Sequence, residues 1–290
     1  KKFSKESFIS LNNIFFGTLI FSVMLGVTYP LIYEFLFDQK ISVGAPFYNA
    51  VFIPIVVLAV FFLFFSVDSK WSRNINLKFL STPIFLSLLF SSISVICTAY
   101  LFNTNNLAIL VSIFAGAIII FRYIIEVLNY FLNKKYINPF SVIAHMALGL
   151  LLVSISFNSL LSTERALNIK INEYEEYKDL KIYFEDIRVL NNSNNDSIKA
   201  TFLIEDLDGK KFNLSPEKRR YFTRGQITTE TAIHIMPLKD IYMTIGDQLD
   251  DGSWIVNIQI NYLIRFIWFS AALMAFAGIM LVFSNKSKQV

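Results

Sequence analysis

Few residue types in this chain could carry chemistry, and the two histidines stand out among them. His145 is the only ionisable residue between Pro139 and Leu161, in an otherwise uncharged stretch. An ionisable side chain at lipid depth is costly, so it usually faces the interior of a helix bundle and has a function. From these residues alone three interpretations of His145 stay open: a helix-packing hydrogen bond, axial ligation of a haem, and a proton relay.

Gly149 follows His145 by four residues, so in a helix both lie on one face. Its missing side chain would leave room for a flat macrocycle beside an imidazole, which is a usual axial ligand of haem. No other apolar segment holds a histidine, so a second axial ligand would come from outside this chain. His234 lies in a polar region without a Cys or second His nearby, and we interpret it as an ordinary strand residue.

Signatures of other enzyme classes are absent from the sequence. There is no Gly-x-x-x-x-Gly-Lys-Ser phosphate loop, no Gly-x-Ser-x-Gly, no His-Glu-x-x-His and no Cys-x-x-Cys. The single cysteine, Cys97, lies in an apolar run and is interpreted as a small buried hydrophobe. The basic run 218–220 is interpreted as a solvated turn rather than a phosphate site.

The elements that must position His145 are transmembrane helices. Hydrophobic residues make up 54% of the chain and charged residues only 17%, against about 25% in soluble proteins. Disordered, coiled-coil and nucleic-acid-binding proteins are therefore excluded. Six apolar blocks are predicted to cross a bilayer: 7–33, 49–67, 81–102, 107–121, 139–161 and 266–284. The fourth is short for a span and must borrow Asn105, Asn106 and the neighbourhood of Arg122 at its ends.

Basic residues in the connections predict the orientation. With the N-terminus inside, the inside segments carry eleven Lys and Arg residues, Arg122 among them, whereas the short outside loops carry only Lys40. The same alternation places residues 162–260 on the outer face of the membrane.

The hydrophobic period of residues 162–260 differs from that of the apolar blocks and predicts a β-rich domain. Short β-rich runs cover 181–190, 198–204, 232–236, 241–245 and 254–260, with turn signals in 191–196, at Asp208-Gly209 and at Asp251-Gly252. About five strands in this length suggest a compact antiparallel barrel or sandwich. We therefore expect a mainly α polytopic membrane protein with three parts: a five-helix transmembrane region over 1–161, the β-rich domain over 162–260, and the last transmembrane helix with a short inside tail over 261–290.

Several strings together resemble one family. They are Ser10-Leu-Asn-Asn13, Lys40-Ile-Ser-Val-Gly-Ala-Pro-Phe-Tyr-Asn49, Ala144-His-Met-Ala-Leu-Gly149, Leu161-Ser-Thr-Glu-Arg165, Thr228-Thr-Glu-Thr-Ala-Ile233 and Asp240-Ile-Tyr242. In this order, over about residues 4–284, the chain resembles the C-terminal half of CcmF, the haem lyase subunit of cytochrome c maturation in bacteria and some mitochondria. The large insert before the last helix also agrees with that family.

The resemblance implies a cofactor and partners. Proteins of this family are thought to take haem from the haem chaperone CcmE and to help attach it to the two thiols of apocytochrome c, beside thiol-handling partners, in an inner membrane. They also hold a haem b between two transmembrane histidines, and His145 matches the second of these by its Ala-His-x-x-x-Gly surroundings. The loop with Gly44, Pro46 and Asn49 is a candidate haem or partner contact at the outer surface; a plain helix connection is the alternative.

Parts of the family pattern have no counterpart in this sequence. These are the Trp-rich outer segment, its two flanking histidines and the first transmembrane haem histidine, so the resemblance implies an upstream half of the same lyase, lost by truncation or encoded separately. This chain alone is therefore not expected to be an active lyase. Two rival functions stay open: a transporter or channel subunit with His145 as proton relay and Pro54 or Pro83 as gate points, and a partner-binding scaffold.

Overall fold

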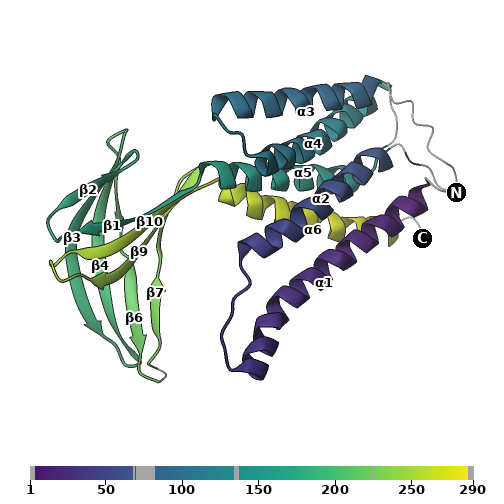
Figure 1. The fold of residues 1–290 in the computed structure, drawn as a ribbon. Helices are drawn as coiled ribbons and strands as arrows, with labels where there is room; N and C mark the ends of the chain where they lie inside the picture. The colour runs from purple at the N-terminus through teal and green to yellow at the C-terminus, as the bar shows by residue number, and fades with distance from the viewer. Residues whose placement is uncertain (1–3, 68, 70–81, 134–136, 224, 287–290) are drawn as a thin grey trace. The chain divides into compact units, whose positions relative to one another are not determined.

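The computed structural model describes residues 4–67, 69, 82–133, 137–223 and 225–286. Within this described part the helices are α1 Lys5–Phe37, α2 Ala45–Ser66, α3 Thr82–Leu101, α4 Leu107–Asn133, α5 Pro139–Leu161 and α6 Ile264–Lys286 (Figure 1). All six are long and apolar enough to cross a membrane, so the protein is a multi-pass membrane protein. The chain forms two compact units, a helix unit of residues 1–156 and 266–290 and a strand unit of residues 157–265.

The fourth helix is longer than its predicted span of 107–121. It continues as one helix through Arg122 to Asn133. The charge at Arg122 does not end the helix because Arg122 Nη1 donates to Glu126 Oε1 at 2.7 Å, one turn further on. Arg122 is therefore not a loop residue, and the predicted orientation loses one basic residue from its inside count.

Other basic residues of the orientation argument lie outside the described residues. They are Lys1, Lys2, Lys70, Arg73, Lys78, Lys134, Lys135 and Lys288. The orientation of the chain in the membrane consequently stays a prediction.

Helix α4 supplies much of the buried core of the helix unit. Its Ala115, Ile118, Ile119 and Tyr123 pack with apolar side chains of α2, α3 and α5. On α3 the buried face is polar and small, with Ser87, Ser91 and Thr98 each donating a hydroxyl to the carbonyl four residues earlier. Small residues of this kind allow helices to pack closely. This matters in a membrane because the hydrophobic effect does not drive helices together in lipid.

Cys97 is exposed on α3, which contradicts the expectation that it is buried. It directly precedes the buried Thr98, and consecutive residues of a helix point about 100° apart. An apolar neighbourhood in the sequence therefore did not indicate which way the thiol faces.

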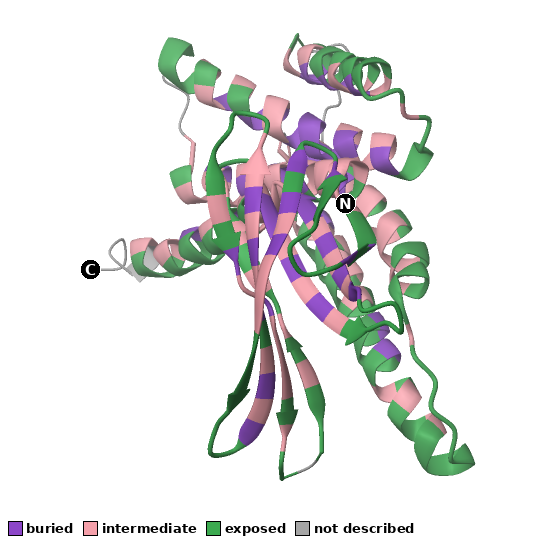
Figure 2. Ribbon diagram, turned by 90° about the vertical axis from the view of Figure 1, so that its left-hand side faces the viewer, coloured by how far each residue is buried: buried purple, intermediate pink, exposed green. Residues whose placement is uncertain are grey.

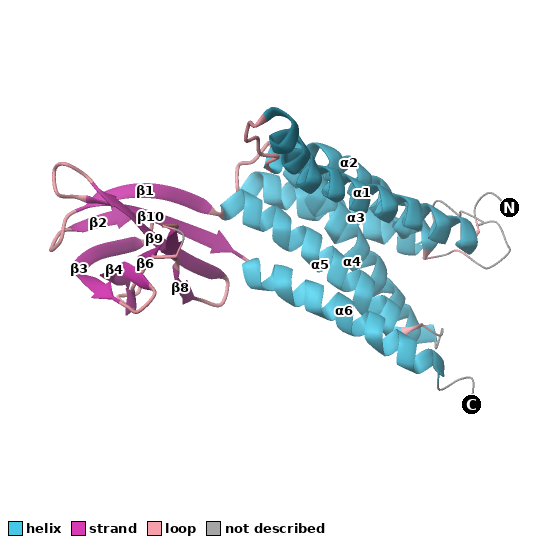
Figure 3. Ribbon diagram, turned by 90° about the horizontal axis from the view of Figure 1, so that it is seen from below, coloured by secondary structure: helices cyan, strands magenta, loops and turns pink. Residues whose placement is uncertain are grey.

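In the described residues of the strand unit, ten strands pair antiparallel and form two sheets. Figure 3 shows these strands in magenta. The four-stranded sheet has the order β1 (Thr163–Ile169), β10 (Trp254–Tyr262), β9 (Lys239–Gln248) and β8 (Ala232–Ile235). The other sheet has the order β2 (Tyr174–Tyr177), β3 (Leu180–Asn191), β4 (Asn195–Asp206), β6 (Glu217–Tyr221) and β7 (Ile227–Glu230), and β5 (Lys211–Leu214) also pairs with β4. The predicted β-rich domain before the last helix is confirmed.

Period-two burial explains how these strands make one core. Along β10, Trp254, Val256, Ile258 and Ile260 are buried and the residues between them are more exposed. Figure 2 shows buried and less buried positions alternating along several strands. Aliphatic and aromatic residues of β3, β4 and β9 complete the core, in which the rings of Phe184 and Phe202 stack with 4.4 Å between centroids. Each fully buried side chain of this size contributes about 1.5–3 kcal/mol, so this core holds the two sheets together.

All five predicted β-rich runs lie in or overlap observed strands. The predicted turns at Asp208-Gly209 and Asp251-Gly252 are also observed. Gly209 and Gly252 have φ of +74° and +83°, a conformation that glycine adopts without steric cost, in the β4–β5 and β9–β10 turns. The missed strands are β1, β2, β5, β6 and β7. Four of these have only four or five residues, and all carry many polar side chains, so hydrophobic alternation could not reveal them.

Candidate functional site

His145 lines a cavity inside the helix unit. The cavity has a volume of about 470 Å³ and is bounded by residues of α1, α2, α4 and α5 and of the short segments after α2 and before α5. Its apolar wall includes Phe8, Phe15, Phe62, Leu63 and Val142, and its polar wall includes Lys5, Asn12, Tyr123, Glu126, Asn138 and His145. The volume falls in the range of small-molecule and cofactor sites, and such sites combine apolar walls with a few polar groups in this way.

A hydrogen bond to the backbone determines which nitrogen of His145 is available. Nδ1 lies 2.6 Å from the carbonyl oxygen of Ser141 and 3.3 Å from its hydroxyl. A carbonyl oxygen only accepts, so Nδ1 carries the proton and donates it. The neutral ring then keeps its lone pair on Nε2, which is the form of histidine that ligates metals.

The ring of Tyr123 lies parallel to the ring of His145. Their centroids are 5.0 Å apart, the interplanar angle is 4°, and Tyr123 is only 8% exposed. The tyrosine belongs to α4 and the histidine to α5, so the stacked pair is a contact between these two helices in the wall of the cavity.

The structure gives Gly149 a different role from the expected one. A side chain built on Gly149 would lie 2.7 Å from Ile120 Cγ1 and 2.8 Å from the Gly116 carbonyl oxygen, and Gly149 is not among the described residues that line the cavity. The glycine therefore lets α4 approach α5 closely and does not open space for a macrocycle beside the imidazole. Small residues facing each other on two membrane helices commonly do this.

Sequence reasoning missed Tyr123 and Glu126, although both line the cavity. Both lie beyond the predicted apolar block 107–121, which ends just before the charge of Arg122. The available signal was the spacing of Arg122 and Glu126, since opposite charges four residues apart pair along a helix. Both residues of this pair are nearly completely buried.

The loop residues Gly44, Pro46 and Asn49 lie apart from this cavity among the described residues. Gly44 has φ of −105° and is the N-cap of α2, with Pro46 in the first turn of that helix. The backbone at Gly44 is therefore accessible to any residue, and a side chain there would meet only Pro46 Cδ at 3.6 Å. Asn49 is exposed on α2. The loop thus has the geometry of a helix start.

His234 lies on β8, where its ring stacks on that of Phe212 with 3.6 Å between centroids and an angle of 8°. Burial lowers the pKa of His234, while the carboxylates of Asp206 and Asp240 act in the opposite direction. Among the described residues no three His, Cys, Asp or Glu side chains gather to hold a metal ion.

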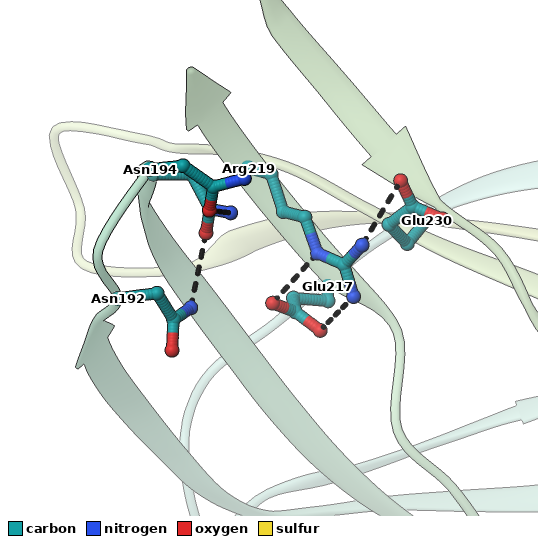
Figure 4. Close-up of polar contacts among 6 residues, drawn as sticks. Asn192, Asn194, Glu217, Arg219 and Glu230 are labelled. Atoms are coloured by element: carbon teal, nitrogen blue, oxygen red, sulfur yellow. Dashed lines mark hydrogen bonds and ion pairs between the residues drawn. The ribbon is translucent and has the colours of Figure 1, made fainter. Parts of the chain in front are cut away.

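The basic run 218–220 lies in strand β6 and not in a turn. Arg219 makes two hydrogen bonds of 3.0 Å to the Glu217 carboxylate and an ion pair of 3.5 Å with Glu230, while Asn192, Asn194 and Asn195 form a separate set of amide contacts (Figure 4). The hydrogen bond from Arg219 lowers the pKa of Glu217, and the bond to Glu217 raises the pKa of Arg219. These pairs neutralise the charge of Arg219, which argues against a phosphate site at this residue.

The two chain ends of the strand unit are tied together. Asn158 Nδ2 donates to the Tyr262 carbonyl oxygen at 2.7 Å, and the Tyr262 amide donates to Ser162 Oγ at 3.1 Å. Arg265 forms an ion pair of 3.3 Å with the buried carboxylate of Asp240. Ser162 and Asp240 belong to two of the strings on which the family resemblance rests, and both have structural roles.

Comparison with known proteins agrees with this fold. Residues 160–261 match the family described as the CcmF C-terminal beta-sandwich. The chain is 26% identical over 287 residues to the cytochrome c-type biogenesis protein CcmF of Pseudomonas fluorescens, covering 96% of this chain and 43% of that protein. It is 28% identical over 293 residues to CcmF of Escherichia coli K12, covering 99% of this chain and 45% of that protein.

A solved structure named cytochrome c heme lyase CcmF has the same fold. Its TM-score with this chain is 0.76 at 16% sequence identity, covering 96% of this chain and 46% of the solved chain. The chain therefore spans less than half the length of the CcmF relatives described here. The predicted resemblance to the C-terminal half of CcmF is confirmed, with both the six apolar helices and the β-sandwich.

Proposed function

Because this chain is similar to the CcmF proteins of cytochrome c biogenesis along nearly its whole length, we propose that it forms part of a cytochrome c haem lyase. In this proposal its own contribution is one axial ligand, His145, to a haem b held among the transmembrane helices. The second ligand belongs to the part of the lyase that this chain does not span.

The observation that carries the proposal is the hydrogen bond from His145 Nδ1 to the Ser141 carbonyl. It leaves Nε2 as the nitrogen with a lone pair, on a ring that lines a cavity of about 470 Å³. Histidines that ligate metals usually donate their other ring N–H in this way.

The cavity walls fit a haem in their chemistry. Phe8, Phe15 and Phe62 offer apolar surface to a macrocycle and exclude water, while Lys5 and Asn138 offer polar groups to its carboxylates. A bound haem b would supply one-electron redox chemistry, with a potential that depends on its axial ligands and burial. The chain's own contribution is to hold the imidazole in one tautomer and one orientation.

The partners follow from the family. The proposed partners are the remaining part of the same lyase, the haem chaperone CcmE, apocytochrome c and its thiol-handling proteins. The proposed location is an inner membrane, bacterial or mitochondrial, with the β-sandwich on the outer face, where it would offer surface for haem delivery.

The test compares the two histidines. The chain is expressed in membranes together with the part of a CcmF protein that it does not span, and His145→Ala is compared with the matched control His234→Ala. We expect the low-spin haem spectrum to be lost or converted to high spin in His145→Ala and unchanged in His234→Ala, with both variants present in the membrane. An unchanged spectrum and potential in His145→Ala would return this residue to helix packing or proton relay.

A further inference from the structure

We propose that Tyr123 is a positioning residue for His145: its stacked ring fixes the plane of the imidazole and so the direction in which Nε2 points. The stacking itself is independent of any ligand. Its consequence for a bound haem rests on the proposed function of His145.

One contact alone does not hold a histidine ring in place. The torsion that rotates an imidazole about its bond to Cβ is soft and has broad, roughly two-fold minima. The hydrogen bond of 2.6 Å to the Ser141 carbonyl points Nδ1 along the helix but permits a range of tilts, because carbonyl oxygens accept over a broad angular distribution. A second constraint perpendicular to the ring is needed to select one plane.

Tyr123 provides this perpendicular constraint. Its ring is parallel to the imidazole within 4°, with the centroids 5.0 Å apart, so tilting the imidazole would push it against the tyrosine face. Stacked aromatic pairs gain stability beyond the burial of their surface, so this pair favours one orientation of the imidazole ring.

The tyrosine is itself held in place. It is 8% exposed and belongs to the core cluster of the helix unit. Gly116 and Gly149 bring α4 and α5 into contact, since a side chain on either would meet the backbone of the other at 2.7–2.8 Å. The spacing of the two helices therefore sets the distance between the tyrosine and the imidazole, and a neighbouring helix orients the candidate ligand.

A first experiment measures the stacking without any haem. The full chain carries only two histidines, so selective labelling of histidine in lipid bilayers gives two sets of ring resonances in magnetic resonance spectra, which His145→Ala assigns. A stacked aromatic ring shifts these resonances upfield. We expect Tyr123→Leu to move the His145 resonances downfield and Tyr123→Phe to leave them in place.

The strand unit offers a matched control for this measurement. Phe212 stacks on His234 at 3.6 Å, so Phe212→Leu should move only the His234 resonances. If Tyr123→Leu fails to accumulate, Tyr123→Met replaces it as a flexible side chain of similar size. His145 resonances that do not move in either variant would overturn the proposal.

A second experiment asks whether the fixed plane matters to a haem. The chain is paired with the rest of a CcmF protein, and electron paramagnetic resonance is recorded at matched haem content. The g-value spread of low-spin haem depends on the planes of its axial imidazoles, so Tyr123→Leu should change this spread and shift the reduction potential, while Tyr123→Phe restores both.

The outcomes separate the two proposals. Loss of the low-spin signal in His145→Ala with unchanged g values and potential in Tyr123→Leu would overturn the positioning role and leave the haem ligand standing. A low-spin signal that survives in His145→Ala would overturn the proposed function and, with it, the consequence for haem; the histidine resonances would still report the stacking.

Discussion

Both histidines of this chain stack on an aromatic ring, but their surroundings differ. In the helix unit His145 lies parallel to Tyr123, donates Nδ1–H to a backbone carbonyl and lines a cavity. In the sandwich His234 lies parallel to Phe212, even closer, on a short strand at the end of its sheet. Stacking is therefore common to both rings, whereas the cavity and the fixed tautomer that make an imidazole available as a ligand are found at His145.

The two units also differ in where their apolar side chains point. In the sandwich, Phe184, Phe202 and Ile258 are completely buried, and the strands alternate between inside and outside. In the helix unit many large apolar residues face outward, for example Phe61 at 54% exposure. Lipid is a suitable neighbour for such residues, so stability here depends more on close packing and on polar pairs than on water exclusion.

The largest expected effect tests the dry core of the sandwich. Phe202→Ala should lower the free energy of unfolding of this unit by about 3–5 kcal/mol, since it leaves a cavity where Phe184 now stacks. Guanidinium unfolding of the chain, followed by the fluorescence of Trp254 with the other tryptophans replaced, measures this. Phe61→Ala on the outside of α2 is the control, and a similar loss in both variants would contradict the contrast between the units.

The next effect tests the close approach of α4 and α5. Gly149→Val should destabilise the helix unit by about 1–3 kcal/mol through overpacking, because the added carbons meet backbone and β-carbon atoms that cannot move freely. It should also shift the His145 ring resonances by displacing Tyr123. Thermal unfolding in detergent checks the first expectation, with Gly17→Val as a control, since nothing lies within 4 Å of that position. Equal melting temperatures for both variants would exclude tight packing at Gly149.

A smaller effect concerns the pH dependence of the sandwich. Because burial lowers the pKa of His234 in the folded state, the unfolded chain takes up its proton first as the pH falls through about 6.5. The free energy of unfolding should therefore decrease with falling pH from this value down to the folded pKa. Denaturant titrations at several pH values measure the slope. His234→Gln should flatten it in this window, and an unaltered slope would assign the effect to other groups.

The smallest effect is expected at the loop before α2. Gly44→Val should leave cytochrome c maturation nearly unchanged, since the residue has φ of −105° and its nearest neighbour is at 3.6 Å. Comparing c-type cytochrome levels in strains with each form measures this. A strong loss of maturation would mean that the loop touches haem or a partner, as the family resemblance allows.

Much of the architecture was predictable from the sequence, for physical reasons. Blocks of about 20 uncharged residues have few alternatives to crossing a membrane, and alternating runs such as that of β10 have few alternatives to a half-buried strand. Short polar strands such as β6 were missed, since their pairing is decided by neighbours distant in sequence. The length of α4 was also missed. Arg122 and Glu126 neutralise each other, so the helix continues beyond the first charged residue.

The candidate site was predictable only in part. His145 could be singled out because it is an isolated ionisable residue, but its partners Tyr123 and Ser141 required the packing of α4 on α5 and the local backbone. Gly149 shows the limit most clearly. Its spacing from His145 predicts a shared face, but only the structure shows that another helix occupies the space.

The ties at Tyr262 give the sandwich the character of an insertion. Asn158 and Ser162, where the chain enters, bond to Tyr262, where it leaves, so entry and exit are neighbours. A folded domain whose two ends lie close together can be inserted between two consecutive helices without separating them. Residues 157–265 thus form a compact unit whose entry and exit are held side by side by its own hydrogen bonds.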